Sequence, residues 1–509
     1  MTVPEEASIA ELARLMADGA LRSTGLVETF RERIEAEDEA FRSVAFLNPD
    51  ALEIASERDR ERAAGRVRGP MHGVPVLMKD NIATGDAMMT TAGSLALDGV
   101  RAEADSHVAR RLRESGAVLL GKTNLSEWAN FRSTRSSSGW SSRGGQVRNA
   151  YATDRTPGGS SSGSGVAVAR DFAPAAIGTE TDGSVVGPSA MNSIAGIKPT
   201  LGLVSRAGIV PIAASQDTAG PMARTVADAA ILLGAISGAD ADDPASRPPP
   251  DADFTRFLDS GALRETRIGV VRNYCGFHEA VDRVFEGALE VLADAGAVIV
   301  DEVEMPSREA IRPHEVLVMR TEFKQGLNAW LSALGPECPV HSLAELIRFN
   351  IDRADRVMPW FGQEQLIAAE ETDGLESEAY RRALSECRRL TRDDGIDRAM
   401  GDFRLDALVA PTSPVPWAID LVNGDNRLGG SSGLAAVSGY PSVTVPAGYV
   451  AGLPVGLSFI GGAWRDGALI GYAHAFEQAA QARVPPGPAR PWQPVSARSA
   501  SETLPRSRD

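Results

Sequence analysis

Cysteine is scarce in this sequence, and the few cysteines follow no recognised pattern. Cys275, Cys338 and Cys387 are far apart and odd in number, with neither Cys-x-x-Cys nor mixed Cys/His ligand spacing. Regularly spaced cysteines would indicate a disulfide scaffold or a zinc site. The sequence therefore predicts ordinary packed thiols, no metal and no other cofactor.

Long apolar runs and an excess of positive charge are also missing. No stretch approaches transmembrane length, and the start, Met-Thr-Val-Pro-Glu-Glu, lacks the basic segment and apolar core of a signal peptide. The net charge of -16 at pH 7 disfavours nonspecific binding to nucleic acid. We expect a cytoplasmic protein with neither a nucleic acid nor a membrane as partner.

Histidine, the usual base for a serine nucleophile, occurs only six times and never in a recognisable catalytic frame. The letters Gly-Ser-Ser-Ser-Gly at 159–163 match the Gly-x-Ser-x-Gly elbow, but that elbow follows a strand and the preceding run here is polar. Around Ser184 both glycines of the elbow are replaced, by Asp182 and Val186. A Ser-His-Asp triad is therefore disfavoured.

Small residues are concentrated in two stretches, Gly-Gly-Ser-Ser-Ser-Gly-Ser-Gly at 158–165 and Gly-Thr-Glu-Thr-Asp-Gly-Ser at 178–184. Such composition alone is typical of a flexible linker. The flanks argue against a linker, because Val-Ala-Val-Ala at 166–169 and Ala-Pro-Ala-Ala-Ile at 173–177 are apolar. We interpret the two stretches as functional loops between core elements.

A lysine could replace histidine as the base. Residues 69–75 form a turn that leads into a short apolar strand ending at Lys79. Taken alone, Lys79 could equally be a solvated charge at a strand end. To accept a proton at pH 7, its pKa must fall by about three units, a shift that burial without a counter-charge can supply. Asp80 must then point elsewhere, as alternation along a strand allows.

These motifs, in this order, resemble the amidase signature family of serine hydrolases. The resemblance implies that Lys79 is a neutral base, that Ser160 is a bridging serine held by a cis peptide bond, and that Ser184 is the nucleophile. It also implies an oxyanion hole formed by the backbone N–H groups of Thr181, Asp182 and Gly183. Many family members carry glycine where Asp182 stands, so the role of this carboxylate is open.

The resemblance is dense over residues 70–225 and resumes over 405–480. The runs at 138–146, 179–184 and 215–222 look most like the bacterial peptide amidases, which remove the C-terminal amide from peptides. This implies an acyl-enzyme, release of ammonia, a peptide or other small-molecule amide as substrate, and a monomer or homodimer. Two alternatives stay open: an aryl- or acyl-amide hydrolase acting on non-peptide substrates, and the glutaminase subunit of a tRNA-dependent amidotransferase.

The fold class implied by the resemblance is α/β, with a single large amidase signature domain over residues 1–484 and a mixed β-sheet covered by helices on both faces. The pattern agrees, because helical and strand segments alternate. We expect helices over 106–114 and 225–236 and strands over 117–120, 268–271 and 297–300. The resemblance further implies that a helical region at about 315–400 shapes substrate choice. The Pro-, Arg- and Ser-rich residues 485–509 are expected to be disordered.

The loop over residues 131–140 is a candidate for binding the acyl side of a substrate. Its aromatic ends and many hydroxyl groups suit an extended polar peptide, and its candidate contacts are Ser133, Thr134 and Ser136. A solvated surface loop explains the same composition equally well.

One motif points to a different chemistry. Gly-Ala-Val-Leu-Leu-Gly-Lys-Thr at 116–123 satisfies the phosphate-binding pattern Gly-x4-Gly-Lys-Thr. The four intervening residues, however, are themselves the expected strand, whereas a phosphate-binding loop follows its strand. Nucleotide binding is therefore not predicted.

Overall fold

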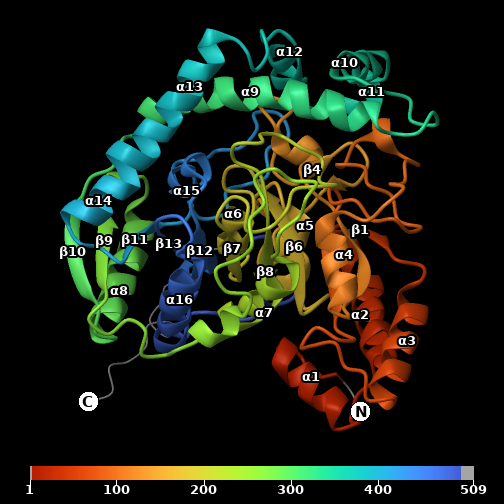
Figure 1. Cartoon of the computed structure of the whole chain (residues 1–509), viewed down its shortest axis with the longest axis horizontal. Coiled ribbons are helices and arrows are strands. Elements are labelled where there is room, and N and C mark those ends of the chain that lie inside the picture. The colour runs from red at the N-terminus through yellow and green to blue at the C-terminus, as the bar shows by residue number, and fades with distance from the viewer. Residues whose placement is uncertain (1–2, 494–509) are drawn as a thin grey trace.

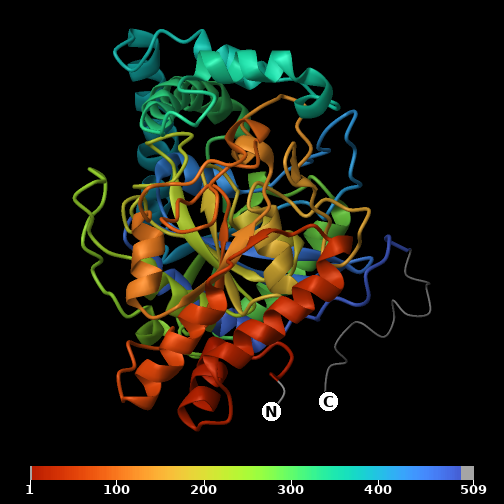
Figure 2. The same ribbon diagram turned by 90° about the vertical axis from the view of Figure 1, so that its right-hand side faces the viewer.

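A twisted mixed β-sheet runs through the middle of the molecule and positions the segments singled out in the sequence (Figures 1 and 2). The computed structural model describes residues 3–493, apart from the side chain of Glu302. The strands of this part are β1 Val44–Leu47, β2 Pro75–Lys79, β3 Val118–Thr123, β4 Trp140–Ser141, β5 Gly145–Gln146, β6 Ala175–Glu180, β7 Ala195–Lys198, β8 Thr218–Ala223, β9 Arg267–Val271, β10 Val298–Val303, β11 Ala407–Pro411, β12 Ser442–Val450 and β13 Leu453–Ile460.

Helices flank this sheet. They are α1 Ile9–Ala17, α2 Ser23–Glu37, α3 Ala51–Ala63, α4 His107–Glu114, α5 Ser162–Ala169, α6 Val186–Met191, α7 Val226–Ile236, α8 Glu279–Asp294, α9 Arg308–Ser332, α10 Leu343–Asp352, α11 Ala354–Val357, α12 Glu364–Glu370, α13 Glu378–Arg388, α14 Asp397–Asp402, α15 Ser432–Ser438 and α16 Asp466–Ala480. The predicted α/β class, a large mixed sheet flanked by helices in a single domain, is confirmed.

The order of the 11 strands of the main sheet, within the described residues, is β1-β3-β2-β6-β8-β7-β12-β13-β11-β9-β10. Strand β2 lies parallel to both β3 and β6, and β9 lies parallel to both β10 and β11. The other neighbours are antiparallel. Because β2 and β6 run parallel, their carboxyl ends lie at the same edge of the sheet, and these ends are Lys79 and Glu180.

The central strands consist mostly of small and apolar residues, because both faces of the sheet are covered. Every residue of β2, β3 and β6 is buried. Continuous buried strands of this kind are typical of sheets with helices on both faces. A lysine that ends such a strand is removed from water, and this determines the chemistry of Lys79.

Helices α9 to α14 form the expected helical region above one edge of the sheet. In Figure 1, α9 crosses the top of the molecule, and α13 descends along one side toward α14. Both α12 and α13 pack against α9. The region covers the sheet edge without adding strands to the sheet.

Residues 118–123 of the phosphate-loop motif form β3, in line with the strand that the sequence indicated there. Gly121 pairs with Leu77 and with Leu47, so it lies between two neighbouring strands. A Cβ atom at Gly121 would come within 2.2 Å of the Phe46 carbonyl oxygen. Close packing of strands accounts for this glycine.

The segment after α16 makes hydrogen bonds with the loop that precedes the first serine stretch. The Thr153 N–H donates to the Arg490 carbonyl (2.9 Å), and the Trp492 N–H donates to Asp154 (2.6 Å). The disorder expected for residues 485–509 stays a prediction. Of that range, residues 494–509 lie outside the described residues.

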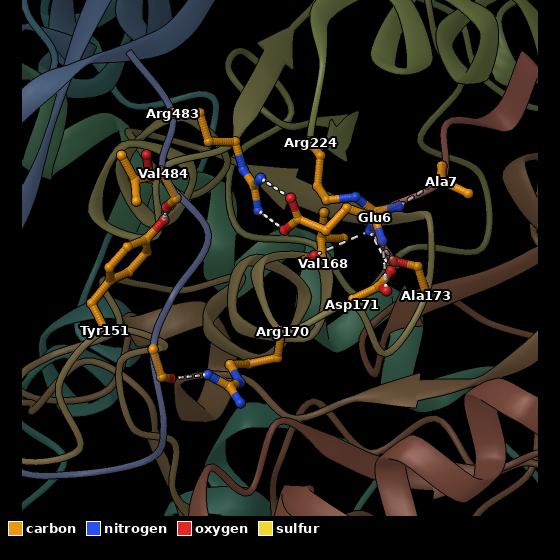
Figure 3. A network of polar contacts seen from close by, with 12 residues as sticks. Glu6, Ala7, Tyr151, Val168, Arg170, Asp171, Ala173, Arg224, Arg483 and Val484 are labelled. Atoms are coloured by element: carbon orange, nitrogen blue, oxygen red, sulfur yellow. Dashed lines mark hydrogen bonds and ion pairs between the residues drawn. The ribbon is translucent and has the colours of Figure 1, made fainter. Parts of the chain in front are cut away.

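A polar network ties both ends of the described chain to the sheet (Figure 3). Arg483 donates two hydrogen bonds of 2.6 Å to the Glu6 carboxylate. Arg224, which follows β8, donates to the Ala7 carbonyl at 2.8 Å and to the Ala173 carbonyl at 3.0 Å. The network anchors the N-terminal segment and the segment after α16 beside the strand that leads to the candidate nucleophile.

Within residues 3–493, no helix is long and apolar enough to cross a membrane. The described side chains likewise include no group of three or more His, Cys, Asp or Glu that could hold a metal ion.

Candidate active site

Lys79 ends β2 and is completely buried. Its Nζ lies 2.7 Å from Ser160 Oγ, 2.9 Å from Thr179 Oγ1 and 3.2 Å from the Thr179 carbonyl oxygen. All three partners are neutral groups. The structure therefore brings together two residues that are 81 positions apart in the sequence.

Burial lowers the pKa of Lys79 to about 7, against the weaker opposing effects of the negative charges of Glu180 and Asp217. A neutral amine has two N–H donors and one lone pair. Its three contacts fit this inventory if the N–H groups donate to Thr179 and the lone pair accepts the Ser160 hydroxyl proton. The site thus favours a lysine that can take up a proton near neutral pH.

Asp80 points away from this lysine, as a basic role for Lys79 requires. Its carboxylate accepts hydrogen bonds from the backbone N–H and the hydroxyl of Thr91. The positive charge of Lys122 also acts on it, although burial still raises the pKa of Asp80 to about 6. Asp80 therefore does not supply a counter-charge that would keep Lys79 protonated.

Ser160 follows a cis peptide bond between Gly159 and Ser160. Its carbonyl accepts the Ser126 N–H at 3.1 Å. The next residue, Ser161, donates its N–H to the Ser184 carbonyl at 3.2 Å and its hydroxyl to the Thr179 carbonyl at 3.1 Å. The first serine stretch is thus bonded directly to the second.

Ser184 lies in the turn between β6 and α6. Glu180, the last residue of β6, accepts the N–H groups of Val185 (2.8 Å) and Val186 (3.0 Å) with one carboxylate oxygen. The carboxylate thereby bonds to the start of α6 and closes the turn around Ser184. Burial raises the pKa of Glu180, and the positive charge of Lys198 opposes this effect.

The backbone N–H groups of the same turn are free to bind an acceptor. Among the described residues, those of Thr181, Asp182 and Gly183 donate no hydrogen bond to a protein atom. Gly183 has φ = +76°, and a Cβ there would come within 2.8 Å of Ser432 Oγ. Glycine is therefore required at this position for both its conformation and its close packing.

Two side chains from the loop before β8 hold Thr181 in place. Its hydroxyl donates to Asp217 at 2.5 Å, and its carbonyl accepts the Gln216 side-chain N–H at 3.1 Å. Asp217 also accepts the N–H groups of Ile212 and Ala213. These contacts fix the position of Thr181 beside the free N–H groups.

The candidate substrate contacts lie in a loop that is largely bonded to itself. Ser133 and Ser136 are buried and Thr134 is exposed. The Ser136 hydroxyl donates to the Ser133 carbonyl at 3.1 Å, and the Ser133 hydroxyl accepts the Arg135 N–H at 3.1 Å. Substrate binding by these three residues stays a prediction, and local turn formation accounts for two of the hydroxyls.

Four supporting residues were not identified from the sequence: Thr179, Glu180, Gln216 and Asp217. All four lie inside or beside runs that already carried the family resemblance. Their position in or beside those runs was the only sequence signal for these four residues. It does not indicate which side chains face Lys79 and which face the turn at 181–184.

Comparison with known proteins gives a consistent result along almost the whole chain. The Amidase family model matches residues 25–470. A probable amidase of Arabidopsis thaliana is 40% identical over 495 residues, which cover 95% of this chain and 91% of that protein. A glutamyl-tRNA(Gln) amidotransferase subunit of Halorhodospira halophila is 35% identical over 489 residues, covering 92% of this chain and 96% of the other.

Among solved structures, the native peptide amidase from Stenotrophomonas maltophilia is 50% identical to this chain. Its TM-score is 0.91, and the match covers 95% of this chain and 98% of that protein.

Proposed function

The chain belongs to the amidase family of amide-hydrolysing enzymes, and we propose that it removes the C-terminal amide from peptides, using Ser184, Ser160 and Lys79. The contact that carries this proposal is the 2.7 Å hydrogen bond between Lys79 Nζ and Ser160 Oγ in a fully buried site. A lysine whose pKa is lowered to about 7 can act as a base where histidine is absent.

In the first half of the reaction, Ser184 Oγ attacks the carbonyl carbon of the amide. The hydroxyl proton of Ser184 passes to Ser160, and the proton of Ser160 passes to Lys79 Nζ. The developing oxyanion accepts hydrogen bonds from the N–H groups of Thr181, Asp182 and Gly183. The C–N bond then breaks, the nitrogen takes a proton back through Ser160, and ammonia leaves.

In the second half, water attacks the ester formed on Ser184. The same relay removes a proton from the water and returns one to Ser184 Oγ, so that the products are the peptide acid and the regenerated enzyme. Every proton lost by a nucleophile is accounted for by Lys79 and by the leaving group. The reaction as written uses side chains and backbone N–H groups alone.

Sequence identity to proteins of known class supports the proposed substrate class. The solved peptide amidase is 50% identical to this chain, against 35% for the amidotransferase subunit. We therefore infer that a peptide acyl group and a small amide leaving group are preferred over free glutamine and over aryl amides.

The test compares kcat/KM for a dipeptide amide, the matching anilide and free glutamine, with products identified by mass spectrometry. We expect the dipeptide amide to be preferred at least tenfold, about 1.4 kcal/mol in transition-state binding, with ammonia as a product and the internal peptide bond intact. Folded Ser184→Ala protein should be inactive on all three. Ser160→Ala and Lys79→Ala should lower kcat by orders of magnitude, because the three residues act as one unit.

The possible outcomes separate substrate from chemistry. Tenfold preference for the anilide would assign the enzyme to aryl- or acyl-amide hydrolysis, and tenfold preference for glutamine would assign it to the glutaminase role. Near-normal turnover by folded Ser184→Ala would overturn the assignment of the nucleophile itself.

A further inference from the structure

Asp182 poses an electrostatic problem for the proposed function. Its backbone N–H is one of the proposed oxyanion donors, so its own carboxylate lies within one side-chain length of the negative charge that develops there. Two like charges at such a distance repel each other, and the repulsion is stronger where water is excluded. A turn that stabilises an oxyanion must therefore offset the charge of Asp182.

The side chain of Asp182 lines a small cavity of about 10 Å³. Its Oδ1 atom is buried and has no hydrogen-bond partner among the described residues. The other charged residues lining the cavity are Arg308, Glu315 and Arg427. Two arginines thus share the cavity with the carboxylate.

Glu315, on α9, is a second carboxyl group that lines the same cavity. Burial, and next the negative charge of Asp182, raise the pKa of Glu315 to about 8. Its carboxyl accepts a hydrogen bond of 3.2 Å from Gln216, which also donates to Thr181. Burial and the charge of Asp182 both favour the uncharged form of Glu315, which lessens its competition with Asp182 for the two arginines.

Arg427 lies close to the turn that contains Ser184. It reaches the cavity from an exposed loop, and its Nη2 donates to Ser432 Oγ at 3.1 Å. A Cβ built on Gly183 would lie 2.8 Å from that same Ser432 oxygen and 3.5 Å from Arg427 Nη2. The guanidinium is thus adjacent to the residue that follows Asp182.

We propose that Arg427, assisted by Arg308, is a positioning residue whose positive charge offsets that of the Asp182 carboxylate across the cavity, so that the turn can bind an oxyanion. This inference rests on the proposed role of the turn around Ser184. Arg427 acts through Asp182 and does not itself take part in proton transfer. Removing Arg427 should therefore lower kcat only in protein that still carries Asp182.

A double-mutant cycle tests this dependence. Arg427→Met should lower kcat on a dipeptide amide at least tenfold and change KM less than threefold. In an Asp182→Asn background, the same substitution should change kcat less than twofold. Arg427→Lys should retain most of the activity, because it keeps the positive charge. Arg348→Met, which removes an exposed arginine paired with Asp352, is the matched control.

The same cycle can overturn the proposal. An equal loss of kcat in both backgrounds would show that Arg427 acts independently of Asp182, and an unchanged kcat in Arg427→Met would show that no compensation is needed. If Arg427→Met does not fold, Arg427→Gln takes its place in the cycle. A wrong assignment of Ser184 as the nucleophile would give a different result. Folded Ser184→Ala protein, with Asp182 and Arg427 unchanged, would then still be active.

Discussion

Replacing Lys79 by methionine should abolish turnover and yet stabilise the folded protein. Methionine fills a similar volume and carries no charge, so it removes the base without leaving a large cavity. The stabilisation follows from linkage. A lysine whose pKa falls from 10.5 to about 7 on folding binds fewer protons in the folded than in the unfolded state.

The sign and size follow from that pKa difference. Because the folded pKa is the lower one, the destabilising effect of Lys79 is fully present below pH 7 and fades as pH rises toward 10.5. It amounts to about 5 kcal/mol in the acidic limit, about 4 kcal/mol at pH 7 and about 2 kcal/mol at pH 9. Loss of the hydrogen bonds to Ser160 and Thr179 costs about 1 kcal/mol each and depends little on pH.

The assay is urea unfolding of wild-type and Lys79→Met protein at pH 7 and pH 9, followed by tryptophan fluorescence. The variant should be the more stable at pH 7, and its advantage should shrink by about 2 kcal/mol at pH 9. Lys324→Met, which removes a partly exposed lysine on α9, controls for the loss of one positive charge. An advantage of equal size at both pH values would refute the lowered pKa of Lys79 and with it the argument for a neutral base.

Three further predictions concern the same site. The kcat/KM for a peptide amide should rise with pH through about 7 and then level, because Lys79 must lose its proton to act as a base; a profile that falls over this range would contradict this role. Glu180→Ala should lower both the urea midpoint and kcat, because the buried N–H groups of Val185 and Val186 lose their acceptor at a cost of about 1–3 kcal/mol each. Glu180→Gln keeps a carbonyl acceptor, so its urea midpoint and kcat should lie between those of the wild type and of Glu180→Ala. Treatment with a chelator should leave activity intact, and a loss that added metal restores would refute the metal-free reaction.

The alternation of elements and the order of the motifs could be predicted from the sequence. The helix expected over 106–114 is α4, and the strand expected over 117–120 is the first part of β3. Small residues and continuous apolar segments mark buried strands even in a single sequence. The cis bond before Ser160 was implied by resemblance, since nothing in local composition distinguishes a cis from a trans bond after glycine.

The side chains that position the site could not be predicted in the same way. Thr179 contacts Lys79 across 100 positions of sequence, and Gln216 contacts Thr181 across 35. Such pairs depend on which strands are neighbours, and strand order is a property of the folded sheet. The contacts of Arg490 with Thr153 and of Trp492 with Asp154 likewise depend on the folded arrangement and follow from no compositional rule.

Covalent trapping of the acyl-enzyme would identify the nucleophile. A slowly deacylating peptide ester is mixed with the enzyme, the reaction is quenched in acid, and the proteolytic peptides are mapped by mass spectrometry. We expect the acyl mass on Ser184 and its loss in Ser184→Ala protein. An acyl group on Ser160, on Lys79 or on a residue outside the turn at 181–184 would contradict it.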